Sequence, residues 1–157
     1  MAIEIERKFL VKGESWQEGE PGVRFSQGYL ASDPDRTVRV RLAGERAWLT
    51  IKGRSEGIRR AEFEYEIPVE EAAELLELCL PTVIDKTRYR REIGDFVWEI
   101  DVFHGENEGL VLAEVELPDE HTDFELPKWA GAEVSDDPRY FNSMLSRNPY
   151  REWKSPE

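Results

Sequence analysis

Short runs in which apolar and charged side chains strictly alternate recur along the chain, and they constrain its fold more than any other feature. Such runs lie at residues 3–9, 38–42, 49–52, 61–67, 98–102 and 111–117. Alternation with a period of two is the pattern of a β-strand whose two faces meet different environments. A basic row at 86–90 and a short segment at 27–31 bring the predicted strands to about eight.

About eight strands are enough to close into a barrel, which has no exposed edges and leaves an interior cavity fit for one small ligand. Helical patterns are few. An apolar stripe after Pro68 predicts a surface helix over 69–80, and residues 135–138 predict a second helix start. The sequence therefore predicts an α+β, mainly β fold: a closed eight-stranded β-barrel with a few helices covering the apolar side of the strands.

Length and charge limit the domain organisation and the partners. A chain of 157 residues has room for one domain, and we assign residues 1–148 to it and 149–157 to a C-terminal tail. Asp and Glu outnumber Lys and Arg by 34 to 21, and such an acidic protein repels nucleic acid, although a local basic cluster can still hold a small anion.

Residues 1–12 contain no apolar run typical of a signal peptide or membrane span, so a cytoplasmic protein without a membrane partner is expected. Cys79, in the apolar stripe, is interpreted as a packing residue.

The charged faces of the strands have two interpretations. In the first, the strands are ordinary amphipathic strands with their charged side in water. In the second, the charges serve a common site, because Glu and Asp are poor strand formers and Thr50 is the only uncharged polar residue clearly in phase. The charges are also sorted by strand, with acidic strands holding Glu4, Glu62, Glu99 and Glu114 and basic strands holding Arg39, Lys52 and Arg88. Like charges two residues apart lie about 7 Å from each other and repel.

This sorting becomes favourable when the acidic strands share a divalent cation and the basic strands share a polyanion. Oxygen ligands without sulfur or paired histidine favour Mg²⁺ or Mn²⁺ over Zn²⁺. A carboxylate-bound metal that faces Lys and Arg suits a di- or triphosphate, since the cation neutralises bridging oxygens while guanidinium groups bind the rest. The sequence thus predicts a polar cavity inside the barrel for a small-molecule polyphosphate.

A series of short motifs follows these rows in order along nearly the whole chain. Glu4-Ile5-Glu6-Arg7-Lys8 has the pattern ExExK, and further matches lie at 27–30, 38–41, 49–52, 62–64, 86–89, 99–103, 114–116, 131–135, 139–140 and 142. In these motifs the chain resembles the CYTH superfamily, the triphosphate tunnel metalloenzymes, and most closely its short bacterial inorganic triphosphatase group. The resemblance implies an antiparallel eight-stranded tunnel.

The resemblance also assigns roles to individual residues. It implies that the acidic rows bind metal, directly or through water, with Glu4, Glu6, Glu62, Glu64, Glu114 and Glu116 as ligands and Asp101 as a further candidate. It implies that the basic rows hold phosphates, through Lys8, Arg39, Arg41, Lys52, Lys86 and Arg88. Lys8 would orient or activate the attacking water, and Tyr29 would assist. Whether Lys8 is the base or only positions the water is left open, because neighbouring arginines and glutamates push its pKa in opposite directions.

The function expected on this basis is metal-dependent hydrolysis of a triphosphate, most of all inorganic tripolyphosphate to pyrophosphate and phosphate, with Mg²⁺ or Mn²⁺. The enzymatic alternatives are a class IV-type adenylate cyclase, for which the sequence reveals no base pocket, and a thiamine triphosphatase. A non-catalytic triphosphate- or polyphosphate-binding module is the alternative from another class. The oligomeric state is left open, a homodimer included.

Overall fold

A computed structural model describes residues 3–80 and 83–153. Within these ranges the chain forms nine β-strands: β1 (Ile3–Val11), β2 (Val23–Asp33), β3 (Arg36–Ala43), β4 (Arg46–Gly53), β5 (Arg59–Ile67), β6 (Ile84–Ile93), β7 (Phe96–Phe103), β8 (Val111–Glu116) and β9 (Ala130–Glu133). The same ranges contain two α-helices, α1 (Val69–Glu77) and α2 (Asn142–Leu145). Four 3₁₀ turns complete the described elements: η1 (Ser15–Gln17), η2 (Gly105–Asn107), η3 (Pro138–Tyr140) and η4 (Tyr150–Glu152).

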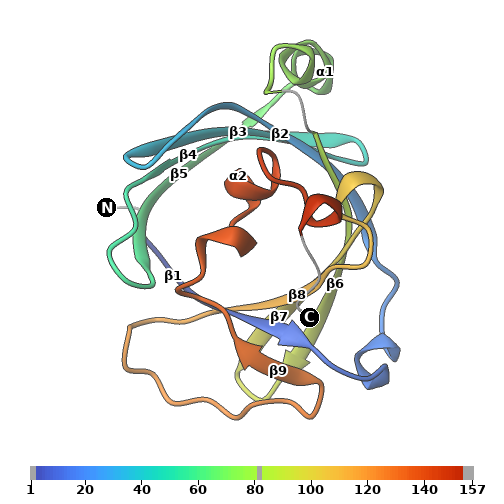
Figure 1. Cartoon of the computed structure of the whole chain (residues 1–157), viewed down its shortest axis with the longest axis vertical. Helices are drawn as coiled ribbons and strands as arrows, with labels where there is room; N and C mark the ends of the chain where they lie inside the picture. The colour runs from blue at the N-terminus through green and yellow to red at the C-terminus, as the bar shows by residue number, and fades with distance from the viewer. Residues whose placement is uncertain (1–2, 81–82, 154–157) are drawn as a thin grey trace.

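Eight of the strands form a closed ring (Figure 1). Their order is β5-β4-β3-β2-β6-β7-β8-β1, and β1 also pairs with β5, which closes the ring. Every pairing in the ring is antiparallel. This confirms the predicted closed arrangement of eight antiparallel strands. β9 adds to β1 outside the ring.

Tight hairpin turns and the pairing register place the alternating residues. The two-residue loops between β3 and β4 and between β6 and β7 begin with Gly44 (φ +62°) and Gly94 (φ +61°), a backbone conformation that glycine adopts without strain. In the resulting register Arg39 lies opposite Thr50, and Thr50 opposite Glu64. Directly paired residues share a face, so the ionic rows point together into the ring.

Apolar residues on the outer face of the ring are covered by helix α1 and by β9 with its preceding loop. Ala72 of α1 packs with Val40 and Ala47, which confirms the predicted surface helix on the sheet. The helix ends at Glu77 rather than at the predicted residue 80. A Cβ on Gly28 would lie 2.8 Å from Cys79 Sγ, so this glycine gives the cysteine room to pack. On another side of the ring Phe9, Trp98 and Trp129 form an aromatic core cluster. No helix within residues 3–80 and 83–153 is long and apolar enough to cross a membrane.

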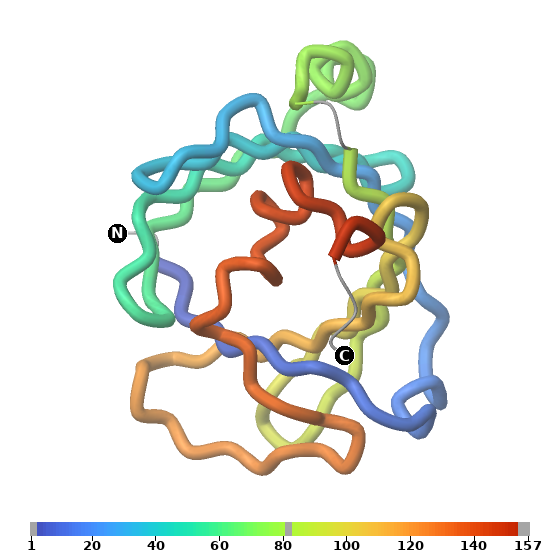
Figure 2. Tube along the Cα trace, viewed as in Figure 1, coloured from blue at the N-terminus to red at the C-terminus, as the bar shows by residue number. Residues whose placement is uncertain are grey.

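The C-terminal segment, residues 138–153, does not cover the outside of the strands as the sequence suggested. It lies within the outline of the ring in Figures 1 and 2, and the predicted second helix is divided into the short turns η3 and α2. Leu145 of α2 is fully buried with Ile84, Phe103 and Leu112. These three residues continue the inner rows of β6, β7 and β8, so one end of the ring interior is apolar and attracts the segment.

The beginning of the predicted C-terminal tail is packed against this segment. The ring of Trp153 lies 5.2 Å from that of Tyr140 and 5.0 Å from that of Tyr150, measured between centroids. The backbone N–H of Tyr150 donates to Asn107 Oδ1 at 2.8 Å, which ties the segment to η2. The domain boundary at residue 148 stays a prediction.

Candidate active site

The order of the strands around the ring sorts the inward ionic side chains into two walls. The four strands β7, β8, β1 and β5 are neighbours and form an acidic wall, with Glu99, Asp101, Glu114, Glu116, Glu4, Glu6, Glu62 and Glu64. The four strands β4, β3, β2 and β6 form the basic wall, in which β2 contributes Gln27 and the others contribute Lys52, Arg39, Arg41, Lys86 and Arg88. Lys8 is the predicted cation that lies among the acidic strands.

Two adjacent chambers occupy the space between the walls. The first chamber contains Lys8, Tyr29 and Phe141 and opens beside the β4–β5 hairpin at Gly57 and Ile58. The second chamber is lined only by polar residues, namely Glu4, Glu6, Arg39, Arg41, Lys52, Glu62, Glu64, Arg88, Glu99, Glu114, Glu116 and Asn142. Both chambers are lined by Glu4, Glu6, Arg39, Lys52 and Asn142. The structure thus brings all the predicted site residues into one interior, and Lys86 and Asp101 alone among them line neither chamber.

One boundary between the walls is an ion-pair cluster around Lys52. Its Nζ lies 3.0 and 3.1 Å from the two carboxylate oxygens of Glu4 and 3.4 Å from Glu62 Oε2. Burial would raise the pKa of Glu4, but the charge of Lys52 and the hydrogen bonds with Glu62 and Lys52 together lower it. The pKa of Glu62 is instead raised to about 7, first by burial and then by its contact with the Glu4 carboxylate. One cation therefore does not neutralise both glutamates.

Arg39 of the basic wall is buried and has one N–H group, at Nε, without a hydrogen-bond partner in the described residues. Its Nη2 donates to Thr50 Oγ1 at 3.2 Å and lies 3.6 Å from Glu64 Oε2, while Thr50 donates to the same Glu64 oxygen at 3.0 Å. Arg39 Nε is buried and has no hydrogen-bond partner within the described part of the chain. A buried guanidinium N–H without an acceptor is costly, so this group favours an anionic ligand.

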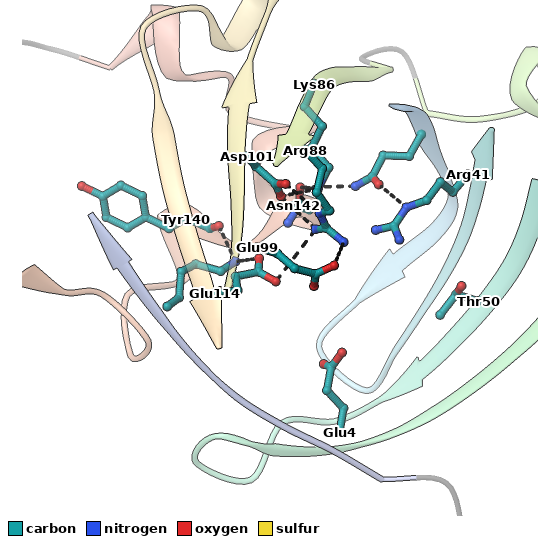
Figure 3. A network of polar contacts seen from close by, with 12 residues as sticks. Glu4, Arg41, Thr50, Lys86, Arg88, Glu99, Asp101, Glu114, Tyr140 and Asn142 are labelled. Carbon is teal, nitrogen blue, oxygen red and sulfur yellow. Dashed lines mark hydrogen bonds and ion pairs between the residues drawn. The ribbon is translucent and has the colours of Figure 1, made fainter. Parts of the chain in front are cut away.

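The other boundary is formed by Lys86, Arg88 and Asp101 (Figure 3). Asp101 accepts from Lys86 Nζ at 2.8 Å and from Arg88 Nε and Nη2 at 2.7 and 2.9 Å. These cations overcome the effect of burial and hold the pKa of Asp101 far below its ordinary value. Burial lowers the pKa of Lys86 to about 7 even beside Asp101, and the charges of Arg88 and Arg41 act in the same direction. The part of Asp101 as a metal ligand stays a prediction, and its oxygens here are engaged by the two cations.

Lys8 and Tyr29 lie at the first chamber. Lys8 Nζ donates to the Tyr140 carbonyl at 3.0 Å and lies 3.5 Å from Glu114 Oε1. Tyr29 is 4% exposed and belongs to the apolar cluster around Leu145. The C-terminal segment therefore fixes Lys8 through a carbonyl and packs beside Tyr29.

The acidic wall carries more negative charge than the neighbouring cations offset. Glu6 lies directly opposite Glu116 in the pairing of β1 with β8. Burial and then the charges of Glu114 and Glu4 raise the pKa of Glu6 well above its ordinary value. Burial followed by Glu4 and Glu99 likewise raises the pKa of Glu116. This crowding of oxygen ligands fits a hard divalent cation, although no group of three within residues 3–80 and 83–153 is already close enough to form a metal site.

The raised pKa values predict the pH dependence of the metal-free protein. A carboxyl group whose pKa is raised on folding binds its proton more tightly in the folded state, so its contribution to stability is lost as pH rises. Glu62 loses its contribution between about pH 4.5 and 7, and Glu6 and Glu116 act in the same direction. Asp101 and Glu114, whose pKa values are lowered, act only below this window.

We therefore expect the melting temperature, measured by differential scanning fluorimetry in EDTA, to fall from pH 5 to pH 7. Above pH 7 the lowered pKa of Lys86 acts in the opposite direction. Mg²⁺ or Mn²⁺ should reduce the fall, because metal binding needs the deprotonated carboxylates. A melting temperature that rises from pH 5 to pH 7 without metal would contradict the expected crowding of negative charge.

Four interior residues were assigned no individual role from the sequence: Gln27, Thr50, Asn142 and Glu99, of which Glu99 was noted only as a member of an acidic strand. Glu99 Oε2 lies 3.3 Å from Arg88 Nη1 and lines the second chamber, as its position two residues before Asp101 on one strand face could have indicated. Gln27 and Thr50 lie in phase with the ionic rows. Asn142 lies outside the strands on a short helical turn, so strand alternation does not predict its position, and only the motif match at 142 pointed to it.

The fold and the site together define a single-chain tunnel protein in which an acidic and a basic wall enclose a polar interior. Residues 2–143 match the family described as the CYTH domain, and the chain belongs to this family. It is 53% identical over 155 residues to an inorganic triphosphatase of Acetivibrio thermocellus, covering 98% of this chain and 99% of the relative. It is 37% identical over 148 residues to an inorganic triphosphatase of Nitrosomonas europaea, covering 91% and 96%. A crystal structure described as an inorganic triphosphatase superposes with a TM-score of 0.67 at 36% identity, covering 93% of this chain and 95% of that one.

Proposed function

We propose that this protein is an enzyme that hydrolyses inorganic triphosphate to pyrophosphate and phosphate inside the ring. The observation that carries the proposal is the pair of facing walls, which can hold a polyanion on one side and its neutralising cation on the other. The relatives described as inorganic triphosphatases, matched over nearly their whole length, support the same activity. The cytoplasmic location and a homodimeric state stay predictions.

The basic wall would bind the phosphate chain. Arg39, with its unpartnered Nε, and Arg41, Lys52 and Arg88 all line the second chamber. Guanidinium groups bind phosphate oxygens through paired hydrogen bonds and retain their charge when buried. The predicted contact of Lys86 with phosphate stays a prediction, because Lys86 is fully buried behind Asp101.

The acidic wall would hold the metal. Triphosphatases of this family depend on metal in general, and we propose Mg²⁺ or Mn²⁺ because every available ligand in the second chamber is a carboxylate. The ligands would come from Glu4, Glu6, Glu62, Glu64, Glu114 and Glu116. A bound divalent cation would neutralise charge on the bridging and leaving oxygens.

Lys8 would orient the attacking water. Phosphoryl transfer needs little covalent participation by the protein, so positioning and charge neutralisation supply most of the catalysis. The Tyr140 carbonyl and Glu114 fix Lys8 Nζ at the first chamber, next to the residues that both chambers share. This fixed geometry favours positioning of a water, and Tyr29 would pack beside it.

Replacing Lys8 with alanine should therefore reduce turnover of tripolyphosphate by about a hundredfold or more with little loss of folded structure. The measurement is phosphate release at saturating substrate, with circular dichroism as the check on folding. Lys12→Ala changes an exposed lysine just beyond β1 and should leave the rate unchanged. A rate for Lys8→Ala equal to that of the unmodified protein would remove Lys8 from the mechanism.

One observation favours a competing substrate class. The first chamber contains Tyr29, Ile58 and Phe141, which could contact the base of a nucleotide or the thiamine group.

The purified protein should be given tripolyphosphate, ATP and thiamine triphosphate with Mg²⁺ or Mn²⁺, while phosphate, pyrophosphate and cyclic AMP are followed separately. Phosphate with pyrophosphate from tripolyphosphate supports the proposal. Cyclic AMP from ATP supports a cyclase, and phosphate only from thiamine triphosphate supports a thiamine triphosphatase. Tight binding without product supports a binding module.

A further inference from the structure

Asn142, the first residue of α2, brings an amide side chain from the C-terminal segment into the polar network of the ring interior (Figure 3). Its Oδ1 accepts from Lys86 Nζ at 3.2 Å and from Gln27 Nε2 at 3.2 Å. Gln27 Oε1 in turn accepts from Arg41 Nε at 2.9 Å. Two amides therefore connect a cation of β3 with a cation of β6.

The chemistry of the two ends fixes the orientation of both amides. A lysine ammonium and an arginine guanidinium can only donate hydrogen bonds. The atom of Gln27 that faces Arg41 must therefore be its oxygen, so its NH₂ group faces Asn142. The atom of Asn142 that accepts from this group, and that also faces Lys86, must then be its oxygen. Asn142 Nδ2 consequently points away from Lys86.

The Nδ2 group of Asn142 is left for a ligand. Asn142 lines both chambers, together with Arg39 and Lys52. Its Nδ2 makes no hydrogen bond to another residue of the described ranges. Two N–H donors of fixed orientation therefore border the interior in which a phosphate chain would lie.

We propose that Asn142 is a substrate-binding residue whose Nδ2 donates to a phosphoryl oxygen, and that Lys86 and Gln27 are positioning residues that hold the amide in this orientation. The proposal rests on the proposed function, since it names one more contact to the same polyphosphate. It also explains the burial of Lys86, which acts on the substrate through Asn142 rather than by direct contact. The C-terminal segment thus contributes to the binding site as well as to the apolar core.

Asn142→Asp tests the proposal with a side chain of the same shape. The carboxylate can still accept from Lys86 and Gln27, but it removes both donors and presents a negative charge to the phosphate. We expect affinity for tripolyphosphate, measured by isothermal titration calorimetry in EDTA and as the KM of phosphate release with Mg²⁺, to fall about tenfold to hundredfold. Asn142→Ala removes the donors without adding charge and should also weaken binding about tenfold or more.

Asn148→Asp is the matched control, because it makes the same change at an exposed site on the same segment. Its affinity should equal that of the unmodified protein. If the unmodified protein binds tripolyphosphate and both Asn142 variants bind it within twofold, the role of Asn142 is wrong while the proposed function stands. If the unmodified protein neither binds tripolyphosphate in EDTA nor releases phosphate from it with Mg²⁺, the proposed function itself fails.

Gln27→Glu tests the positioning role. Glutamate can still accept from Arg41, but it offers Asn142 only acceptor oxygens and should turn Nδ2 away from the substrate. We expect weaker binding in the otherwise unmodified protein and a clearly smaller effect in the Asn142→Ala background, because the group being oriented is then absent. Equal effects in the two backgrounds would overturn the positioning role of Gln27.

Discussion

Removal of divalent cations should abolish hydrolysis of tripolyphosphate. The second chamber has seven carboxyl groups and only four cationic side chains, so carboxyl groups crowd the space that a polyanion would enter. A metal bound to the acidic wall reverses this balance, and metal stabilisation of phosphoryl transfer is worth several kcal/mol. We expect phosphate release to fall about a thousandfold or more in EDTA and to return when Mg²⁺ or Mn²⁺ is added in excess. Hydrolysis that continues unchanged in EDTA would contradict the role of the acidic wall.

Glu6→Gln tests the same wall in two ways, because it should raise the stability of the metal-free protein and weaken its activation by metal. The change removes a charge directly opposite Glu116, so the metal-free protein should melt at a higher temperature. It also removes a proposed metal ligand, so more metal should be needed for half-maximal phosphate release. Glu14→Gln, an exposed control before η1, should change neither quantity. Unchanged metal dependence in Glu6→Gln would exclude Glu6 as a ligand.

Replacing Asp101 with alanine should be among the most destabilising single changes in the ring. Lys86 and Arg88 would remain buried without the carboxylate that accepts three hydrogen bonds from them. Loss of one partner from a buried ion pair costs about 3–5 kcal/mol in the free energy of unfolding. Urea denaturation of the metal-free protein measures this loss.

Two further variants test whether the lost ion pair causes the decrease in the free energy of unfolding of Asp101→Ala. Asp101→Asn keeps the shape and one accepting oxygen, but its NH₂ group must face a donor of Lys86 or Arg88, so its loss should be smaller than that of Asp101→Ala and still measurable. Asp95→Ala, in the exposed turn between β6 and β7, should change stability little. If Asp101→Ala unfolds at the same urea concentration as the unmodified protein but binds metal more weakly, Asp101 is a metal ligand rather than a structural anchor.

Much of the fold could be predicted from the sequence because most strands show an alternation of apolar and charged residues within their own length. Alternation with a period of two marked the strand rows, and the stripe after Pro68 marked α1. β2 was predicted only at 27–31, whereas it runs from Val23 to Asp33. Its outer part lacks clear alternation, and pairing with both β3 and β6 extends it.

The candidate site was predictable as a set of residue types, and its internal contacts were not. Glu4, Arg41 and Glu116 lie far apart in the sequence and line one chamber of the structure. Strand alternation does not distinguish Asp101, which is bound by Lys86 and Arg88, from the glutamates that face the chamber. The contacts of Asn142 with Gln27 and Lys86 join residues 115 and 56 positions apart, so no local pattern could reveal them.

Local residue order by itself determined which faces of the strands are ionic and that eight such strands can close into a ring. It also determined that the inward carboxylates and cations, apart from Lys8, occupy different strands. The tertiary structure alone decided that the acidic strands are neighbours and face the basic ones, because β1 pairs with both β5 and β8. It also decided that the C-terminal segment enters the ring. Both outcomes depend on contacts between residues that are distant in the sequence. Burial and charge in the closed ring set the free energies of these contacts, so no periodic pattern in the sequence indicates them.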